Sequence, residues 1–336
     1  MASDGARVEE STRVIPLREI DPGNEEFRIT TRRAGDDFDS SLQRLGLLAA
    51  PLVLGGERGV TLLSGFRRVE ACRRLGWEAI AARVLPARTP LYACALKAVA
   101  ENSLQRPLNL IETSRSLSLL ERHAPGGKIP PEDAAALGLP GHTGLTARLK
   151  TLCRMPAEVQ EAVLEDAVSF AMACELGRMD EEAAVALARL FRELKTGLNK
   201  QREIVTLVAE IALREGSSPR AVLSDPELTA LQSAGELDRN EKTRCIRRRL
   251  RQRRFPALLA AESSFQALRQ RLKLGENLQL APPRDFEGTR FTLTFSFERL
   301  EEVGRLRAKL DELMNHPDFK TLLTGKGTGF AEDPVP

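Results

Sequence analysis

Short hydrophobic runs alternate with short helical patterns through residues 14–100. The runs "PLVLGG" and "GVTLLSG" flank a Gly-rich turn and predict two strands, while "RVIPLREIDPG" and "WEAIAARVLP" predict one more each. Between these runs, "FRRVEACRRLG" repeats hydrophobic residues at helical spacing and ends at Gly76, and residues 38–45 predict another short helix. This alternation predicts a small α/β domain.

The pattern becomes helical from Asn109 to about Arg254. Asn109 and Glu112 have the spacing of a helix N-cap and its N3 partner, so they predict a helix that starts there and runs toward His123. The following stretches "PPEDAAALGL" and "GLTARLKTLCRM" predict a short helix, a turn and a second helix. This is the outline of a helix-turn-helix.

The last part of the chain mixes helical and strand periods. "PALLAAESSFQALRQRLKLG" and "RLEEVGRLRAKLDELM" are amphipathic helical patterns, whereas "TRFTLTFSFE" alternates strictly and predicts a strand. So short a segment has a thin hydrophobic core, and we therefore expect it to pair with a second copy of the chain.

Composition adds a size class and an uneven charge. The 336 residues are 42% hydrophobic and 29% charged, which indicates a soluble globular protein of more than one domain. The net charge is only +3, yet eight Lys and Arg residues lie between Lys242 and Arg254. Five cysteines and three histidines are dispersed, which argues against disulfides, zinc and Ser-His or Cys-His catalysis. We expect neither a signal peptide nor a membrane span.

A candidate anion site lies in "LLSGFRR". A predicted strand runs into Ser64 and Gly65, and the next helix carries Arg67 and Arg68 in its first turn. The helix dipole disfavours cations there, whereas a bound anion would meet both guanidinium groups and the N–H groups of the helix start. The alternative is that both arginines are ordinary solvated surface residues.

A candidate metal site lies in "AENSLQRPLNLIE". Glu101 and Asn102 offer oxygen atoms of the kind that Mg²⁺ binds, usually together with substrate phosphates. The alternative is that they are polar residues at a helix end, where such residues are common.

Together, these motifs resemble those of the ParB family of chromosome and plasmid partition proteins. "GLLAAPLVL" resembles the first box of the family, "LLSGFRRVEACRRLGWEAIAARVL" its G-E-R-R box, and "AENSLQRPLNLIE" its E-N-x-Q-R…L-N-x-I-E box. Residues 130–163 resemble its helix-turn-helix and the L-P-x-x-V-Q element that follows. The likeness runs from about Val14 to Val163, with a weaker one at a C-terminal dimerisation domain.

The resemblance implies a sulfiredoxin-like N-terminal domain that binds CTP and Mg²⁺, and a dimer that closes into a clamp around DNA. It assigns Glu101 a role in catalysis, in the form of weak CTP hydrolysis, and it assigns the metal to Asn102 and Glu101. The residues implied to bind the nucleotide are Ser64, Gly65, Arg67, Arg68, Asn102 and Arg106.

Two boxes depart from the family pattern. Phe66 stands where the family usually has Glu, which puts an apolar group on the packed face of the helix. In the third box, Leu104 takes the usual Gln position and Gln105 the usual Arg position, so Arg106 falls one place late. If Arg106 does not reach the phosphates, nucleotide affinity or hydrolysis is reduced.

Two segments are candidates for DNA binding, with a structural helix pair and a solvated helix as their respective alternatives. In the second helix of the helix-turn-helix, some side chains are candidates for base contacts and others for phosphate contacts. The basic run is a candidate for the phosphate backbone. The base candidates are His142, Thr143, Thr146 and Arg148, and the phosphate candidates are Lys150, Arg154, Arg247, Arg248, Arg249 and Arg251.

The sequence thus predicts a mixed, mostly α protein. We divide it into a disordered tail (1–12), a ParB-like nucleotide-binding domain (13–107), a helix-turn-helix domain (108–200), a helical extension (201–255), a small α+β dimerisation domain (256–320) and a flexible tail (321–336). The expected partners are double-stranded DNA, a second copy of the chain and a ParA-type ATPase, in the cytoplasm at the nucleoid. A ParB-like transcriptional regulator and a nuclease-type enzyme with a diverged nucleotide pocket are the alternatives. Nuclease activity is disfavoured, because no paired carboxylates lie nearby to hold two metal ions.

Overall fold

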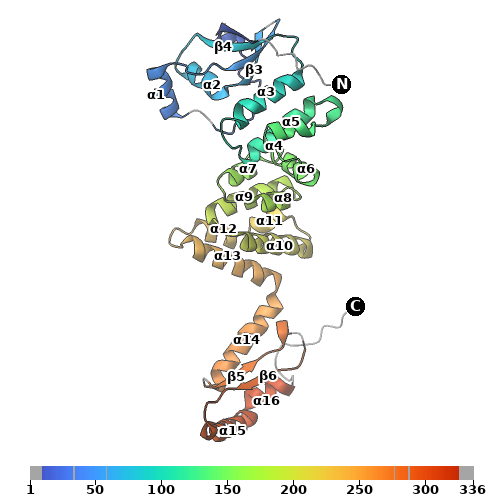
Figure 1. The fold of residues 1–336 in the computed structure, drawn as a ribbon. Coiled ribbons are helices and arrows are strands. Elements are labelled where there is room, and N and C mark those ends of the chain that lie inside the picture. Colours follow the sequence, from blue (N-terminus) through green and yellow to red (C-terminus); the bar gives the residue numbers. More distant parts are fainter. Residues whose placement is uncertain (1–9, 33–34, 58, 276, 287, 325–336) are drawn as a thin grey trace. The chain divides into compact units, whose positions relative to one another are not determined.

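A computed structural model describes residues 10–32, 35–57, 59–275, 277–286 and 288–324 (Figure 1). The outermost parts of the two predicted tails, residues 1–9 and 325–336, lie outside the described residues. The chain divides into two compact units, with the boundary between Arg202 and Glu203, and each is described by itself below.

The first unit begins with a small mixed sheet in the order β1-β4-β2-β3. β2 and β3 form an antiparallel hairpin, β1 and β4 are antiparallel, and β2 runs parallel to β4. Because a parallel pair needs a crossover connection, the helix between β3 and β4 packs on the sheet. The strands are β1 (Ser11–Pro16), β2 (Leu52–Gly56), β3 (Gly59–Ser64) and β4 (Ala79–Leu85).

Short helices cover this sheet, as Figure 1 shows for the blue and cyan part of the ribbon. The crossover helix buries Phe66, Val69 and Cys72, the hydrophobic residues whose spacing predicted it. The predicted small α/β arrangement is therefore present. These helices are η1 (Leu17–Glu19), α1 (Asp36–Leu45), α2 (Phe66–Arg74) and α3 (Leu91–Ser103).

A helical array completes the first unit. α4 begins with the predicted capping box, in which the Asn109 side chain accepts from the Glu112 N–H and Glu112 accepts from the Asn109 N–H. Two helices joined by a short turn then follow at the predicted place. The array consists of α4 (Leu110–His123), η2 (Pro125–Gly127), α5 (Pro131–Ala136), α6 (Thr143–Leu152), α7 (Ala157–Leu164), α8 (Phe170–Leu176) and α9 (Glu181–Leu194).

The helices from residue 198 onward include the basic run. A capping box of Asp238 and Glu241 starts the basic helix, which buries Ile246 and Leu250 and whose arginines are exposed or half-buried. The helices are α10 (Leu198–Glu215), α11 (Pro219–Leu223), α12 (Pro226–Ser233) and α13 (Arg239–Arg254).

The C-terminal part has its own hydrophobic cluster around a two-stranded antiparallel sheet. The predicted alternating strand is present, and its partner strand lies in "LQLA". The elements are α14 (Pro256–Leu272), β5 (Leu278–Ala281), η3 (Arg284–Phe286), β6 (Thr292–Phe295), α15 (Leu300–Asn315) and α16 (Pro317–Thr324). The buried cluster comprises Phe265, Leu268, Leu272, Leu278, Leu280, Leu313, Phe319 and Leu322.

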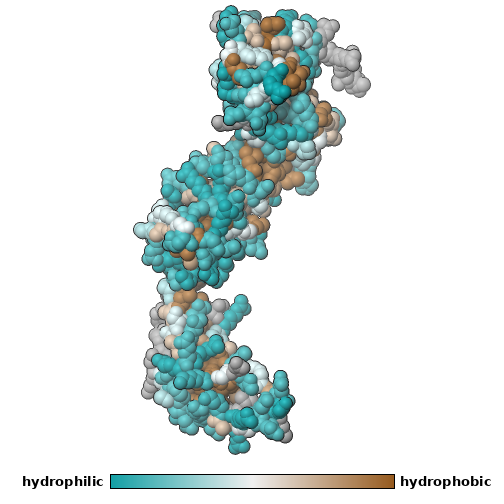
Figure 2. Space-filling view, turned by 90° about the vertical axis from the view of Figure 1, so that its left-hand side faces the viewer, coloured by the Kyte–Doolittle hydropathy of each residue, from teal (hydrophilic) through white to brown (hydrophobic). Residues whose placement is uncertain are grey.

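Hydrophilic residues dominate the face of the molecule drawn in Figure 2, and hydrophobic residues form only small groups on it. Within the described ranges, each helix is too short or too polar to cross a bilayer.

Candidate nucleotide- and DNA-binding sites

The turn from β3 into α2 requires glycine. Gly65 has φ +93°, a left-handed conformation that L side chains rarely adopt, and it serves as the N-cap of α2. A Cβ on Gly65 would also lie 2.7 Å from the Cβ of Pro51. The backbone therefore turns tightly here and brings Arg67 and Arg68 to the start of α2. Among the described residues, no side chain caps this helix start, and its first turn holds no acidic residue.

Arg67 and Arg68 are held in different ways. The Arg67 guanidinium lies 4.8 Å from the centroid of the Phe38 ring in α1, and its buried Nε has no hydrogen-bond partner among the described residues. Arg68 donates from Nη1 to the backbone oxygens of Ala49 and Ala50, at 2.9 and 3.1 Å. Burial lowers the pKa of Arg68, while neighbouring Glu101 raises it. The charge of Glu101 therefore acts directly on the start of α2.

Glu101 and Asn102 lie in the last turn of α3. Glu101 accepts from Nη2 of Arg83 in β4 at 2.6 Å, and Asn102 donates from Nδ2 to the Ala98 oxygen at 2.8 Å. Because the amide nitrogen of Asn102 is the atom engaged with the helix, its Oδ1 is the atom suited to a cation. The two motifs are 33 residues or more apart in sequence, yet the carboxylate of Glu101 lies close enough to act on the guanidinium of Arg68. We call Gly65, Arg67, Arg68, Glu101 and Asn102 the arginine corner.

Ser64 and Arg106 have structural surroundings. Ser64 is buried at the end of β3. Arg106 donates from Nη1 and Nη2 to the two carboxylate oxygens of Glu112, at 2.7 and 2.8 Å. Burial would raise the pKa of Glu112, but hydrogen bonds from Arg106 and from two backbone N–H groups outweigh it and lower the pKa to about 2. The guanidinium that falls one place late in the third box is thus held by a buried carboxylate.

The donor set of the arginine corner fits a phosphate with a magnesium ion. A buried guanidinium nitrogen without a partner and an uncapped helix start are donors that an anion satisfies. Within the described part of the chain, no group of three His, Cys, Asp or Glu side chains is placed to hold a metal ion. Any Mg²⁺ here would therefore take most of its ligands from phosphate oxygens and water, with Asn102 and Glu101 as the protein oxygens.

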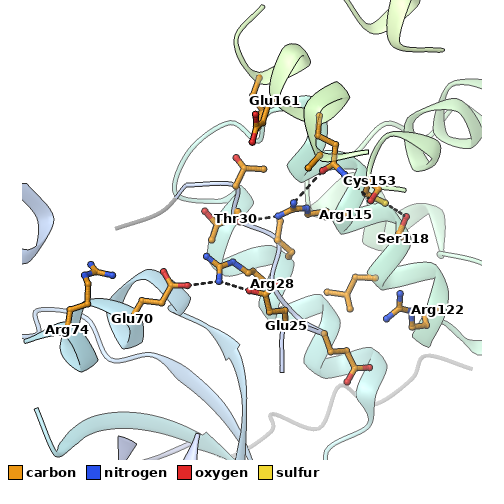
Figure 3. Close-up of a pocket in the computed structure, with 17 residues that line it drawn as sticks. Glu25, Arg28, Thr30, Glu70, Arg74, Arg115, Ser118, Arg122, Cys153 and Glu161 are labelled. Carbon is orange, nitrogen blue, oxygen red and sulfur yellow. Dashed lines mark hydrogen bonds and ion pairs between the residues drawn. The ribbon is translucent and has the colours of Figure 1, made fainter. Parts of the chain in front are cut away.

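A separate cavity of about 780 Å³ lies between the segment of residues 25–31 and helices α2, α4 and α7 (Figure 3). Ion pairs and hydrogen bonds cross it: Arg28 contacts Glu25 and Glu70, and Arg115 donates to the Thr30 oxygen. None of the sequence-predicted site residues lines this cavity. It meets α2 at Glu70 and Arg74, away from the helix start that carries the arginine corner.

The candidate base-reading residues lie on α6 and its N-cap. His142 caps the helix by accepting from the Leu145 N–H, and Thr143 is exposed beside it. Thr146, at the same end, is half-buried. Leu149 and Leu152 are buried farther along α6, so the helix packs through these positions and leaves its N-terminal end accessible.

The remaining side chains of α6 differ in their contacts. Arg148 is exposed and its guanidinium lies 5.1 Å from the Phe170 ring centroid. Lys150 donates to Glu121 at 2.5 Å, and Arg154 is exposed just beyond the helix. The exposed arginines are thus better placed for phosphate than Lys150.

The arginines of α13 mostly contact acidic residues of neighbouring helices. Arg247 and Arg251 both contact Glu203 of α10, and Arg249 contacts Glu227 of α12 at 2.9 Å. Arg248, in contrast, is exposed. The charge run is therefore largely neutralised inside its own unit, which a count of positive residues along the sequence does not reveal.

Sequence reasoning missed Arg83. It lies in β4 among hydrophobic neighbours, where a single arginine resembles an ordinary surface position. The signal that was available is its place in an otherwise apolar strand directly before the buried Val84 and Leu85.

In class, this is a mostly helical protein with a small mixed sheet, an arginine-lined helix start and a two-helix turn. No family model matches the chain. A nucleoid occlusion protein of Oceanobacillus iheyensis is 33% identical to it over 144 residues, which make up 42% of this chain and 48% of that relative. The chain therefore spans about half the length of the curated relative it matches. This match supports the ParB-like resemblance seen in the motifs of the chain.

Solved structures of ParB proteins also align. The C-terminally truncated chromosome-partitioning protein ParB of Caulobacter crescentus, complexed with CTP-gamma-S, is 21% identical, covers 55% of this chain and 99% of its own, and has a TM-score of 0.25. The same protein complexed to the centromeric parS site is 20% identical, with coverages of 56% and 95% and a TM-score of 0.27. A Pnob8-like ParB-N domain is 14% identical, with coverages of 72% and 98% and a TM-score of 0.30. At these scores the structural likeness adds nothing to the assignment.

Proposed function

We propose that the chain is a ParB-like DNA-binding protein of chromosome or plasmid segregation, and that its arginine corner binds CTP with Mg²⁺. The observation that carries the proposal is the meeting of two distant motifs. Arg68 at the start of α2 donates to the oxygens of Ala49 and Ala50. The next residue, Pro51, accepts from the N–H of Arg83, whose guanidinium contacts Glu101 of α3 at 2.6 Å. A triphosphate with its metal needs both the guanidinium groups and the oxygen ligands that these two motifs supply.

Each residue of the corner has a role in this proposal. The N–H groups at the start of α2 and the guanidinium groups of Arg67 and Arg68 bind phosphate oxygens, and Gly65 lets the backbone come close. Asn102 and Glu101 supply oxygens to Mg²⁺, which neutralises phosphate charge when it is bound. Phe66 is buried and contributes packing in place of a polar group. For this reason we expect binding without rapid hydrolysis.

DNA binding is assigned to α6, and the nucleoid in the cytoplasm is the proposed location. The exposed start of α6 offers His142 and Thr143 to base edges, while Arg148 and Arg154 are placed for phosphates. In α13, Arg248 is the proposed phosphate contact, because the neighbouring arginines already bind acidic side chains.

The partner in the clamp is a second copy of this chain, and a ParA-type ATPase is the further partner that the family resemblance implies. The two-stranded sheet of β5 and β6 has edges that a second copy can extend, and Phe297 nearby is 59% exposed. Nucleotide binding at the arginine corner then closes the dimer around DNA.

Thermal unfolding of the full chain with CTP and Mg²⁺ tests the nucleotide assignment. CTP should raise the melting temperature, ATP should not, and Arg67→Ala should abolish the shift. Arg122→Ala, an exposed arginine of α4, is the matched control and should keep it. An equal response to all nucleotides, or no response to any, contradicts the assignment.

Fluorescence anisotropy with DNA duplexes at several salt concentrations tests the DNA assignment. Arg148→Ala and Arg248→Ala should each reduce the slope of log affinity against log salt by about 1, as expected for one lost phosphate contact. Arg247→Ala, whose side chain is already paired with Glu203, should reduce it less. If all three variants keep the wild-type slope, the DNA surface lies elsewhere.

A further inference from the structure

The corner beside α2 contains a third arginine that the motifs do not include. Residues 49–51 act as a common anchor: Arg68 donates to the oxygens of Ala49 and Ala50, and the Arg83 N–H donates to the Pro51 oxygen at 2.8 Å. Gly65 also lies close to Pro51, since a Cβ on Gly65 would be 2.7 Å from the Pro51 Cβ. Arg83 and Arg68 are therefore neighbours in space, although one lies in β4 and the other in α2.

Arg83 and the nearby Lys97 form ion pairs with carboxylates of the chain itself. Arg83 contacts Glu101 through Nη2 at 2.6 Å and Glu10 through Nη1 at 3.5 Å. Lys97, one turn before Glu101 in α3, donates to the other oxygen of Glu10 at 2.7 Å. Three carboxylate oxygens thus occupy positions next to two cations, and carboxylate and phosphate oxygens accept the same kind of charge-assisted hydrogen bond.

The arginine that the third box offers is engaged elsewhere. Arg106 binds both oxygens of Glu112, and Glu112 is fully buried. Releasing Arg106 would leave that carboxylate buried without its partner, which is strongly unfavourable. Arg83 faces a smaller obstacle, because Glu10 and Glu101 are each partly exposed and can turn toward water.

We propose that Arg83 is a phosphate-binding residue of this site and takes the role that Arg106 leaves unfilled. In the ligand-free protein, Glu10 and Glu101 occupy its guanidinium; a polyphosphate displaces Glu10, and Lys97 joins the same anion site. The proposal rests on the function proposed above, because it assigns a further binding residue to the same corner.

Isothermal titration of the full chain with inorganic tripolyphosphate, in the absence of Mg²⁺, tests this role apart from the base and the metal. Arg83→Ala should weaken binding about ten-fold or more, as expected for a lost hydrogen bond between charged groups. Arg83→Lys should recover part of the loss, and Glu10→Gln should strengthen binding several-fold because a competing carboxylate is gone. The control is Arg13→Ala. Arg13 is an exposed arginine of the neighbouring strand β1, where it pairs with Ala82 of β4, and this variant should bind tripolyphosphate as the wild type does.

A double variant separates contact from simple neutralisation of Glu101. If Arg83 binds phosphate, Arg83→Ala with Glu101→Gln remains weak; if Arg83 only neutralises Glu101, the double variant recovers wild-type affinity and the proposal is wrong. Urea unfolding of each variant establishes that it is folded. Wild-type protein that binds no tripolyphosphate also overturns the proposal.

The proposed function and this inference fail in different ways. Tripolyphosphate binding that depends on Arg83, without a CTP-specific thermal shift, retains the anion site and removes the nucleotide assignment. A CTP-specific shift that needs Arg67, together with unchanged tripolyphosphate binding in Arg83→Ala, retains the function and removes the role of Arg83.

Discussion

Arg106 and Glu112 form a bidentate ion pair across the non-helical segment that precedes α4, with nitrogen–oxygen distances of 2.7 and 2.8 Å. Glu112 also accepts from the N–H groups of Thr31 and Asn109, so one buried carboxylate joins three segments of the first unit. Arg106, which the family motif assigns to the nucleotide, thus forms an ion pair within the protein itself.

Removal of one partner of this pair should therefore destabilise the first unit strongly. Arg106→Met leaves a buried carboxylate without its cation, and we expect a loss of about 3–5 kcal/mol in the free energy of unfolding. Urea unfolding followed by circular dichroism measures it. Arg122→Met, at an exposed position of α4, is the control and should change stability by less than about 0.5 kcal/mol. Similar losses in both variants would contradict the structural role of the pair.

The same carboxylate predicts acid sensitivity. The folded pKa of Glu112 is lowered to about 2 from its usual 4.5, so its contribution to stability is complete above about pH 4.5 and is lost as the pH falls toward 2. Urea midpoints across this window should fall with pH in the wild type and fall less in Glu112→Gln. Parallel pH profiles for the two proteins would mean that Glu112 does not titrate as predicted.

Glycine at position 65 should be needed for two separable reasons. Gly65→Ala places a β-carbon on a backbone with φ +93° and within 2.7 Å of Pro51, so it adds a steric clash to conformational strain. Gly76→Ala shares the left-handed backbone, with φ +74°, but meets nothing within 4 Å. We expect a loss of about 1–2 kcal/mol for Gly76→Ala and a clearly larger one for Gly65→Ala. Equal losses in chemical unfolding would show that Pro51 moves aside.

The single tyrosine of the chain reports on the contact between α3 and α5. Tyr92 donates to Asp133 at 2.6 Å, and burial together with this hydrogen bond raises its pKa above the usual 10. Phenolate absorbance should therefore appear only at a pH well above 10 in the wild type. In Asp133→Asn it should appear at lower pH, since the neighbouring negative charge is gone. An identical titration in both proteins would show that the contact is absent in solution.

The ion pairs of α13 should make the second unit sensitive to salt. Glu203 accepts from both Arg247 and Arg251, and Glu203→Gln should lower the free energy of unfolding by about 0.5–1 kcal/mol at low salt and by less at high salt. Glu236→Gln, at an exposed acidic position, is the control. A loss that does not change with salt would point to packing in place of charge.

Local signals in the sequence predicted local structure well. The spacing of Asn109 and Glu112 predicted the capping box, and Phe66 was expected on the packed face of its helix and is buried there. Such features depend on residues a few positions apart, which the backbone geometry of a helix brings together.

Long-range pairing was beyond the sequence. Glu112 lies 6 residues from Arg106, Glu101 lies 18 from Arg83 and Glu203 lies 44 from Arg247. Nothing in the spacing distinguishes an arginine that contacts a ligand from one that contacts a carboxylate. The run in α13 suggested a surface for DNA, but Glu203 and Glu227 belong to other helices, and only the fold brings them to it.

The ion pairs of α13 impose an energetic cost on any polyanion that binds this helix. To gain a guanidinium, the incoming strand must first separate it from a glutamate, so each new contact is an exchange and the net gain is small. Dissolved ions weaken the old and the new pair together. A duplex would bind weakly here and could shift along the helix, whereas a helix whose arginines had no acidic partners would bind it in one position.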